Sequence, residues 1–332
     1  MAETVCLVAE KMEVRAGSQW RGFKHMVTLT LGAVTVNPIA EIEYCPVHVS
    51  FLFNDLTTED MQRNLDWLDD EVVDIVNEKL GFSFRAYLVK IAGLNVLVDA
   101  CNGNHKNRPT ARWQHELDSS GFLDSLKAAG VAPEDINIVV CTHLHCDHVG
   151  WLTQLSEDRW VPTFANARHI FSGKEFDHYH ERMRTQGSAA ANHGAFEDSV
   201  LPVTESCRFE LVQNDMVIVD SPQGTVRLVP SAGHSIDHVS VSIQSQGQEA
   251  IVCGDVVHHP IQLDMPLMPM RSDFDPALAA QSRQDLLNHC ADSGAWLLAG
   301  HFCKYPFVSI RRHNGVFRIK NAASAGEKNG VD

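Results

Sequence analysis

Apolar residues recur along the chain with two periods, and these periods predict a protein that mixes strands with helices. Alternating or continuous apolar runs rich in β-branched residues predict strands, with turns at Gly32, Asn37-Pro38 and Gly93. The predicted strands cover residues 26–31, 34–36, 82–90, 95–99, 135–141, 166–171, 216–220, 225–229, 238–244, 249–253 and the run from 296 to His301. Helical spacing predicts helices at residues 57–79, 119–130, 173–184 and 276–291. Residues 185–200 lack a clear period and predict a mobile flap or loop near the site.

The most unusual polar segment follows the predicted strand at residues 135–141. His143, His145, Asp147 and His148 lie within six residues of one another, and imidazole and carboxylate groups are common metal ligands. Side chains two residues apart at a strand end can point the same way, and the next two ligands can face a second point nearby. One ion seldom needs four ligands from so short a segment. The spacing therefore predicts two neighbouring metal ions at the carboxyl end of a buried strand.

A pattern of apolar strand, glycine and ligand occurs three more times along the chain. The predicted strands lead into Gly233-His234, Gly254-Asp255 and Gly300-His301. Glycine lets the backbone turn sharply and lets a ligand come close. Together with the first segment, these ends supply five histidines and two aspartates. That donor set suits zinc, one or two ions per chain, with manganese, cobalt or iron as alternatives.

The His-x-His-x-Asp-His motif at 143–148 and the three glycine–ligand ends, in this order, resemble the metallo-β-lactamase superfamily over about residues 25–320. The resemblance implies an α/β (α+β) fold, namely an αββα four-layer sandwich of two mixed sheets with two metals at one edge. It assigns His143, His145 and His234 to the first metal, Asp147, His148 and His301 to the second, and Asp255 to both. Asp147 and Asp255 are the candidate catalytic carboxylates. Asp99 is expected to orient a ligand histidine without binding metal itself.

Composition and apolar runs limit the domain organisation, the localisation and the partners that we expect. We expect one metallo-β-lactamase-like domain at residues 25–320, an N-terminal arm at 1–24 and a flexible C-terminal tail at 321–332. Residues 1–20 contain no apolar run of signal-peptide length, and no run is long enough for a membrane span. Nine cysteines without a disulfide framework favour the cytoplasm. A formal charge of −15 argues against nucleic acid and anionic membranes as partners.

Two further features concern packing and the identity of the ligands. Cys146 lies between two ligand positions, and we expect a small buried residue there in preference to a zinc thiolate. Apolar side chains between residues 47 and 53 could pack against a second copy of the chain, which favours a homodimer. They are Val47, Val49, Phe51, Leu52 and Phe53.

The ligand set predicts a hydrolase that acts on a small-molecule substrate. A zinc pair lowers the pKa of bound water to about 7 or below, which makes hydroxide available at neutral pH. The chain has no Gly-x-Ser-x-Gly nucleophile motif. Trp113, Trp151 and Phe302 lie close to ligand segments and are predicted to line an aromatic pocket, with core packing as the alternative. Such a pocket favours a flat, apolar electrophile.

Within the superfamily, Trp151-Leu-Thr and residues 160–168 resemble the branch of quorum-quenching lactonases, methyl parathion hydrolase and chlorothalonil dehalogenase. The specific expectation is hydrolytic dehalogenation of a chlorinated aromatic such as chlorothalonil. The alternative is a lactonase, esterase or organophosphate hydrolase with the same metal centre, and a third is a non-catalytic metal-binding protein. Lactonases of this branch often use a tyrosine near the metals. No tyrosine of this chain is placed there by its sequence position, which favours the dehalogenase.

Overall fold

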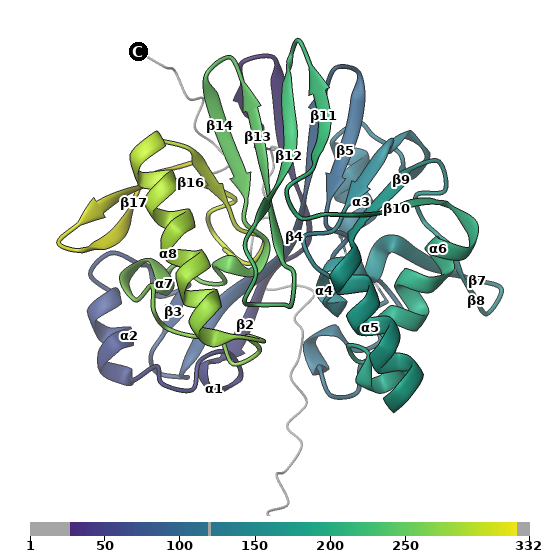
Figure 1. The fold of residues 1–332 in the computed structure, drawn as a ribbon. Helices are drawn as coiled ribbons and strands as arrows, with labels where there is room; N and C mark the ends of the chain where they lie inside the picture. The colour runs from purple at the N-terminus through teal and green to yellow at the C-terminus, as the bar shows by residue number, and fades with distance from the viewer. Residues whose placement is uncertain (1–26, 119–120, 324–332) are drawn as a thin grey trace, which may run out of the picture.

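The computed structural model of the chain describes residues 27–118 and 121–323. Two β-sheets pack face to face, and helices cover the outer face of each sheet (Figure 1). The layers follow the order α, β, β, α, so the αββα sandwich expected from the sequence is confirmed.

The first sheet has eight strands and comes from the N-terminal two thirds of the chain. Its path is β1-β2-β4-β5-β6-β9-β10, and β3 pairs with β4 beside this path. The strands β5, β6, β9 and β10 are parallel neighbours, and the other pairs are antiparallel. The bounds are β1 (Leu29–Leu31), β2 (Val34–His48), β3 (Val73–Asp74), β4 (Lys79–Ile91), β5 (Leu94–Val98), β6 (Ile138–Val140), β9 (Arg168–Ser172) and β10 (Arg208–Val212).

The second sheet has seven strands that pair in sequence order, and only β14 and β15 are parallel. Its strands are β11 (Val217–Ser221), β12 (Gly224–Pro230), β13 (Val239–Ser245), β14 (Gln248–Val252), β15 (Trp296–Leu298), β16 (Phe307–His313) and β17 (Val316–Ala323). A separate two-stranded hairpin joins β7 (Thr153–Ser156) to β8 (Arg159–Pro162).

The helices lie on opposite sides of the two sheets (Figure 1). Three cover the first sheet: α3 (Phe122–Ala128), α5 (Gly173–Gln186) and α6 (Leu201–Ser206). On the side of the second sheet lie α7 (Ile261–Asp264) and α8 (Pro276–Ser293), with α1 (Val49–Leu52) and α2 (Thr58–Asn64) beside them. The short helix α4 (Cys146–Val149) lies between the two halves.

Strand β4 shows why the sheets form in this arrangement. Tyr87 and Val89 belong to the core between the sheets, whereas Ala86 and Leu88 pack on the helical side. Because successive side chains of a strand point to opposite faces, a strand covered on both faces needs an almost continuous apolar run. The sequence from 82 to 91 provides that run, and the hairpin predicted there is confirmed as β4 and β5.

Two predicted local elements are wrong. The helix predicted for residues 57–79 ends at Asn64, although Thr57 and Asp60 form a capping box at its start. The later residues Val72 and Val73 are buried in a core cluster and lead into β3. Asn37 and Pro38 do not form a turn, because β2 continues through them to His48. β1 pairs only as far as Val36, so the missing N–H of proline breaks no ladder with that strand.

Residues 185–200 are helical turns that pack on the core, not an open flap. The segment contains a 3-10 turn at Ser188–Ala190 and a π-helical turn at Phe196–Val200. Ala191, Ala195, Phe196 and Val200 are at most 1% exposed and belong to the core under the first sheet. The absence of a clear apolar period reflects the switch between turn types inside this short segment.

The apolar run from Val47 to Phe53 also packs within its own chain. Val47, Val49, Leu52 and Phe53 are buried in a cluster with Met61 and Ile261, and of the five apolar side chains of the run only Phe51 is exposed. These side chains need no second copy of the chain to cover them, so the sequence argument for a homodimer fails.

The two segments expected on either side of the domain lie mostly beyond the described residues. The expected N-terminal arm at 1–24 falls outside them, and β17 continues to Ala323, inside the segment expected as a tail. Within residues 27–118 and 121–323, no helix combines the length and the hydropathy required to cross a lipid bilayer.

The segment after β5 lies directly against the segment after α4. The N–H of Gly150 donates to the carbonyl of Cys101 at 2.7 Å, and the N–H of Trp151 donates to Ala100 at 2.7 Å. The indole N–H of Trp151 also donates to the buried carboxylate of Glu41 at 2.6 Å. These contacts hold the loop that begins at Asp99 beside the ligand segment.

We expect Gly150→Ala to destabilise the protein strongly. A Cβ at this position would lie 1.7 Å from the carbonyl oxygen of Asn102, a backbone atom that cannot move aside. The expected loss in the free energy of unfolding, measured by denaturant titration, is about 3 kcal/mol or more. Gly173→Ala is the control, because a Cβ there meets its nearest neighbour at 3.7 Å. Equal stability of the two variants would contradict this close approach.

Candidate metal centre

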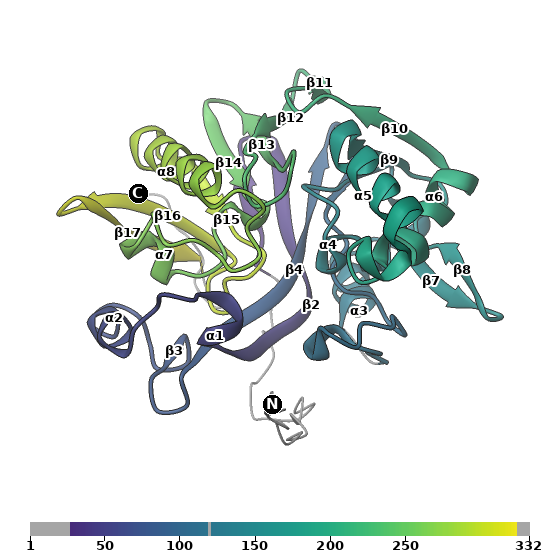
Figure 2. The ribbon, with the colours of Figure 1, turned by 60° about the horizontal axis from the view of Figure 1, so that its bottom comes forward.

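Four strand ends bring the predicted ligands to one edge of the sandwich. The His143–His148 segment follows β6, His234 follows β12, Asp255 follows β14 and His301 follows β15. β12, β14 and β15 run in the same direction within the second sheet, so their carboxyl ends share one edge. Figure 2 brings this edge forward, with α4 between the helical layers of the two halves.

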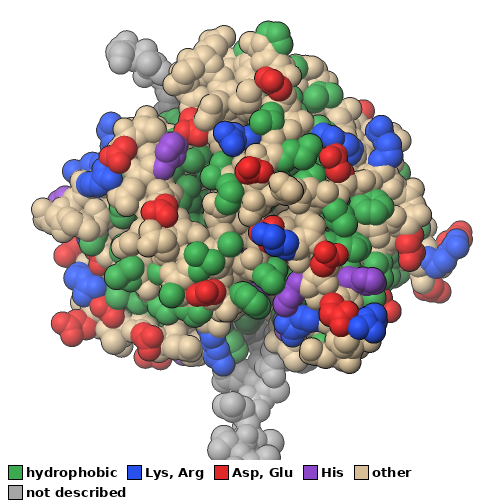
Figure 3. Space-filling model, in the orientation of Figure 1, with side chains coloured by type: hydrophobic (Ala, Val, Ile, Leu, Met, Phe, Trp, Pro, Cys, Tyr) green, Lys and Arg blue, Asp and Glu red, His purple; other side chains and the backbone are tan. Residues whose placement is uncertain are grey.

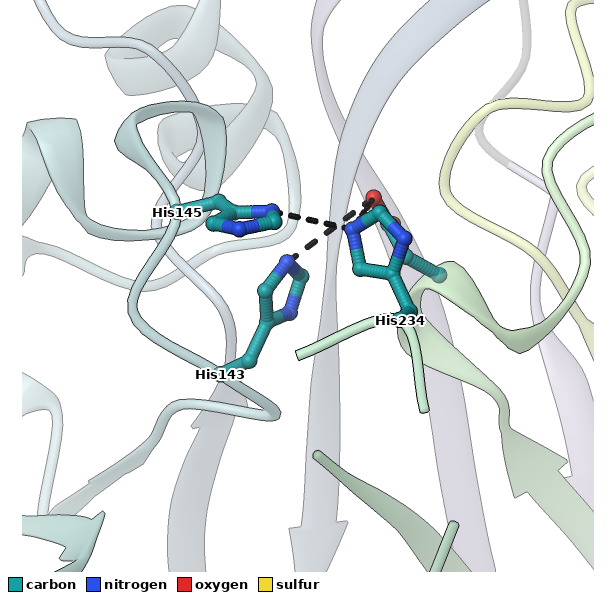
Figure 4. A group of neighbouring side chains, drawn as sticks. His143, His145 and His234 are labelled. Atoms are coloured by element: carbon teal, nitrogen blue, oxygen red, sulfur yellow. Dashed lines mark hydrogen bonds and ion pairs between the residues drawn. The ribbon is translucent and has the colours of Figure 1, made fainter. Parts of the chain in front are cut away.

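The seven predicted ligands form two neighbouring groups of side chains that could hold metal ions. The first contains His143, His145, His234 and Asp255, and the second contains Asp147, His148 and His301. Within each group the potential ligand atoms lie within 4.8 Å of one another. In Figure 4 the rings of His143 and His145 approach His234 from the opposite side of the edge, and His234 Nε2 lies 2.9 Å from His145 Nδ1. Both groups match the donor chemistry of zinc.

Asp255 lies between the two groups, and its two oxygens face different histidines. Oδ2 is 3.2 Å from His234 Nε2 and 3.8 Å from His143 Nε2. Oδ1 is 3.1 Å from His148 Nε2 and 3.2 Å from His301 Nε2. One carboxylate is therefore positioned to serve both groups, in the arrangement that the family resemblance implied.

Acceptors outside the two groups fix the orientation of three histidine rings. Asp99 Oδ2 lies 2.9 Å from His148 Nδ1, in the orienting position predicted for it, and Asp99 also accepts from Thr142. Asp273 Oδ1 lies 2.9 Å from His234 Nδ1. The carbonyl oxygen of Ser83 lies 2.8 Å from His301 Nδ1. In each case the acceptor binds Nδ1 and leaves Nε2 facing Asp255. Nothing in the sequence marks Asp273 or Ser83, because neither belongs to a ligand motif.

The protonation of the centre follows from its burial and its charges. Burial lowers the pKa of His143 and His145, and neighbouring imidazoles lower it further, so both rings are neutral at pH 7. Burial opposes protonation of His234 as well, but Asp255 and Asp273 outweigh it and raise the pKa of His234 to about 9. The pKa values of His148 and His301 are also raised, against burial, chiefly by Asp255. Burial would raise the pKa of Asp255, but the surrounding imidazoles hold it well below its usual range.

The structure places two predicted pocket residues in the core. Trp151 is 4% exposed and stacks on Phe122 with ring centroids 5.4 Å apart. Phe302 is fully buried in the cluster under the second sheet. Both lie within three residues of a ligand, but the 3-10 turn at Gly150–Leu152 and the segment after His301 return into the core, so core packing explains both. Trp113 differs, because it is only partly buried and its ring meets Phe51 at 5.5 Å.

Cys146 is buried, and its thiol contacts a side chain outside the two ligand groups. Its Sγ lies 2.8 Å from Gln114 Oε1 and donates to that amide oxygen. Burial raises the pKa of this thiol above its usual value, so the thiolate that zinc requires is disfavoured.

Two residues that the sequence did not single out lie at the centre. The ring of Tyr179, on α5, is 6.4 Å from the ring of His145, and burial raises the pKa of its phenol, which stays neutral. His258 Nε2 lies 3.2 Å from Asp255 Oδ2. Tyr179 comes from a helix far from the motif in sequence, so only the packing of α5 reveals it. His258 could have been noticed from its position three residues after Asp255.

Metal uptake at pH 7 should release protons, because a ligand imidazole must be free of its second proton. The raised pKa of His234, about 9, means that at least one proton must leave, with His148 and His301 as further sources. Below pH 9 the proton competes with the metal, so apparent affinity should rise with pH up to about that value. Zinc titration calorimetry in buffers of different ionisation enthalpy measures the number released. Uptake without net proton release at pH 7 would refute this account.

Comparison with known proteins identifies the family of the chain. A family model described as the metallo-beta-lactamase superfamily matches residues 85–301, more than half of the chain. A probable metallo-hydrolase of Mycobacterium tuberculosis is 28% identical over 151 residues, 45% of this chain and 46% of that protein. The chain thus matches about half the length of this curated relative.

Solved structures share the fold over almost the whole chain. AidC, a dizinc quorum-quenching lactonase in complex with the product N-hexanoyl-L-homoserine, is similar with a TM-score of 0.72 and 16% identity, over 90% of this chain and 97% of that one. The hydrolase AbOPH, of the beta lactamase superfamily, is similar with a TM-score of 0.69 and 20% identity, over 89% and 96% of the two chains. The family match spans every predicted metal ligand, from His143 to His301. The chain therefore belongs to the metallo-β-lactamase superfamily.

Proposed function

We propose that the chain is a zinc-dependent hydrolase that acts on a small, uncharged electrophile. The observation that carries this proposal is the carboxylate of Asp255, whose two oxygens face histidines of both groups at 3.1 to 3.2 Å. A zinc pair bound there would supply a polarising Lewis acid and a water whose pKa is lowered to about 7. A protein that only stores or senses metal has no need of a carboxylate shared between two such groups.

Several residues near the centre have separate roles in the proposed hydrolysis. The neutral rings of His143 and His145 are available as ligands without loss of a proton. Asp147 has 16% of its side chain exposed, compared with 5% for Asp255, and lies 3.7 Å from His301 Nε2. We assign Asp147 the transfer of a proton between the nucleophile and the leaving group. Tyr179, as a neutral phenol beside His145, can donate a hydrogen bond to a substrate oxygen.

Exposed aromatic side chains lie on segments that touch the ligand segments. Phe51 is 54% exposed and packs against Trp113, whose neighbour Gln114 accepts from Cys146. Phe274 is 56% exposed, and its N–H donates to the carbonyl of His234. On the face shown in Figure 3, hydrophobic side chains in the lower middle lie beside histidine and charged side chains. Exposed apolar surface beside a polar centre favours a substrate with an apolar group.

The structure weakens the sequence arguments that placed dehalogenation first. Trp151 and Phe302 are core residues, and the ring of Tyr179 lies 6.4 Å from that of His145. Lactonases of the resembling branch often use a tyrosine near the metals. We therefore propose a lactone or ester carbonyl as the first substrate class, which the similarity to AidC supports. Hydrolytic dehalogenation of a chlorinated aromatic such as chlorothalonil is the second candidate, because the exposed rings of Phe51 and Phe274 suit a flat ring.

A panel of substrates tests the proposal with zinc-loaded protein. The panel contains an acyl-homoserine lactone, an aryl ester, a phosphotriester and chlorothalonil, with chloride release followed for the last. We expect turnover of the lactone or ester that a chelator abolishes and zinc restores. Asp255→Asn should lower turnover by at least about 100-fold, whereas Asp220→Asn, at an exposed position of β11, should not. Chloride release alone would select the second candidate, and a fully zinc-loaded protein without turnover on the whole panel would refute hydrolysis of these classes.

Phe51→Ala and Phe274→Ala should weaken substrate binding more than the chemical step. Loss of one aromatic contact worth about 1 kcal/mol raises KM about 5-fold and leaves kcat nearly unchanged. Phe209→Ala is the matched control, because Phe209 is a 41% exposed aromatic on β10. Steady-state kinetics on the best substrate of the panel make the measurement. A rise in KM shared by the Phe209 variant, or no rise in any variant, would show that the exposed aromatics do not contact substrate.

A further inference from the structure

His258 lies inside the metal centre although it is not among the seven ligands that the family resemblance implies. It follows Asp255 by three residues and is 1% exposed. Its Nε2 lies 3.2 Å from Asp255 Oδ2, the same oxygen that faces His234 at 3.2 Å. Its ring is stacked on that of His301, 6.0 Å away at an interplanar angle of 2°, and lies 4.7 Å from the ring of His234. His258 is therefore in contact with histidines of both groups.

Neither ring nitrogen of His258 makes a hydrogen bond to the described residues, and the 3.2 Å approach of Nε2 to Asp255 Oδ2 is an ion-pair contact. The backbone of His258 is fixed, because its N–H donates to Gln262 Oε1 at 2.8 Å. A polar group that is buried without a partner costs about 1–3 kcal/mol. Hydrophobic residues of similar size would avoid that cost, so a functional role for the imidazole is the more economical explanation.

Two neighbouring buried histidines have hydrogen-bond partners at both ring nitrogens, as expected for a structural role. His238 is fully satisfied: its Nε2 accepts from the N–H of Asp255 at 3.0 Å, and its Nδ1 contacts Ser231. His259 is also satisfied, by the carbonyl of Val72 and the N–H of Ile261. Of these three buried rings, only that of His258 is directed at the carboxylate of Asp255 without other partners.

The number of ligand atoms in the first group indicates whether His258 binds a metal or positions another ligand. The first group already offers four protein donors, namely three imidazoles and one carboxylate oxygen. A further protein ligand would occupy the position that a hydrolytic metal keeps open. An imidazole N–H this close to the oxygen of Asp255 can instead restrain that carboxylate, as hydrogen bonds to ligating carboxylates do in metal sites.

We propose that His258 is a positioning residue that holds Asp255 by a hydrogen bond from Nε2–H to Oδ2. The bond fixes the shared carboxylate between the two groups, and its loss allows the carboxylate to rotate away from one of them. This role rests on the two groups being the metal site and is independent of the substrate. Its effect is therefore visible in metal binding itself.

Metal affinity and the spectrum of cobalt-substituted protein test the role of His258. Zinc affinity is measured by competition with a chromophoric chelator, and the d–d absorption bands of the Co²⁺ form report ligand geometry. His258→Leu should weaken zinc binding by about 10- to 100-fold, the range found when hydrogen bonds to metal ligands are removed, and should shift the cobalt bands. His258→Gln should restore both within a few-fold, because its amide N–H reaches nearly the same point as Nε2.

His259→Leu is the matched control, because it removes an adjacent buried imidazole that does not contact Asp255. Circular dichroism and thermal unfolding of the metal-free variants verify folding, and the control should keep the wild-type cobalt spectrum. Wild-type affinity and spectrum in His258→Leu would overturn the proposal. So would a glutamine variant as weak as the leucine variant, since a hydrogen-bond donor would then not suffice. Neither outcome depends on turnover, so failure of the proposed hydrolase activity would be seen separately.

Discussion

The site depends on one buried carboxylate held among several imidazoles. Asp255 has 5% of its side chain exposed, yet the surrounding histidines keep its pKa well below the usual range. A buried anion is costly unless charges or hydrogen bonds compensate it. The same carboxylate in turn raises the pKa values of His148, His234 and His301. Without metal, these charges stabilise one another, and binding of divalent ions would displace the protons of these imidazoles.

Further buried carboxylates hold the loops that carry the ligands. Glu41 accepts hydrogen bonds from Asn102, Gly103 and Trp151, and so ties the loop after β5 to the segment after α4. Glu175, on α5, accepts from the backbone of Asp237 at 2.9 Å and approaches that of Leu144, which joins the loops of the first and second sheets. Burial raises the pKa of both glutamates despite these donors. The loops of the site are thus fixed by side chains that never touch a metal.

The sequence anticipated elements whose signal is local. Apolar strands that end in glycine and a ligand residue are visible at His234, Asp255 and His301, because strand period, turn and ligand are adjacent in the chain. The local structures of Pro38 and of residues 185–200 were predicted incorrectly, because they depend on contacts with other segments of the chain. Proline is tolerated in β2 beyond the end of the β1 pairing, and the turns at 188–200 are stabilised by burial under the first sheet.

The sequence by itself determined the chemical identity of the seven candidate ligands, because each motif combines a donor with the strand that precedes it. The resemblance that these motifs carry implied the αββα class. Only the tertiary structure decided which other side chains belong to the centre. Trp151 and Phe302 point into the core, whereas Tyr179, Asp273 and His258 approach the ligands from other segments. Nearness in sequence does not fix the direction of a side chain at a strand end. That direction is set by the packing of two sheets and their helices, which brings together residues that share no local pattern.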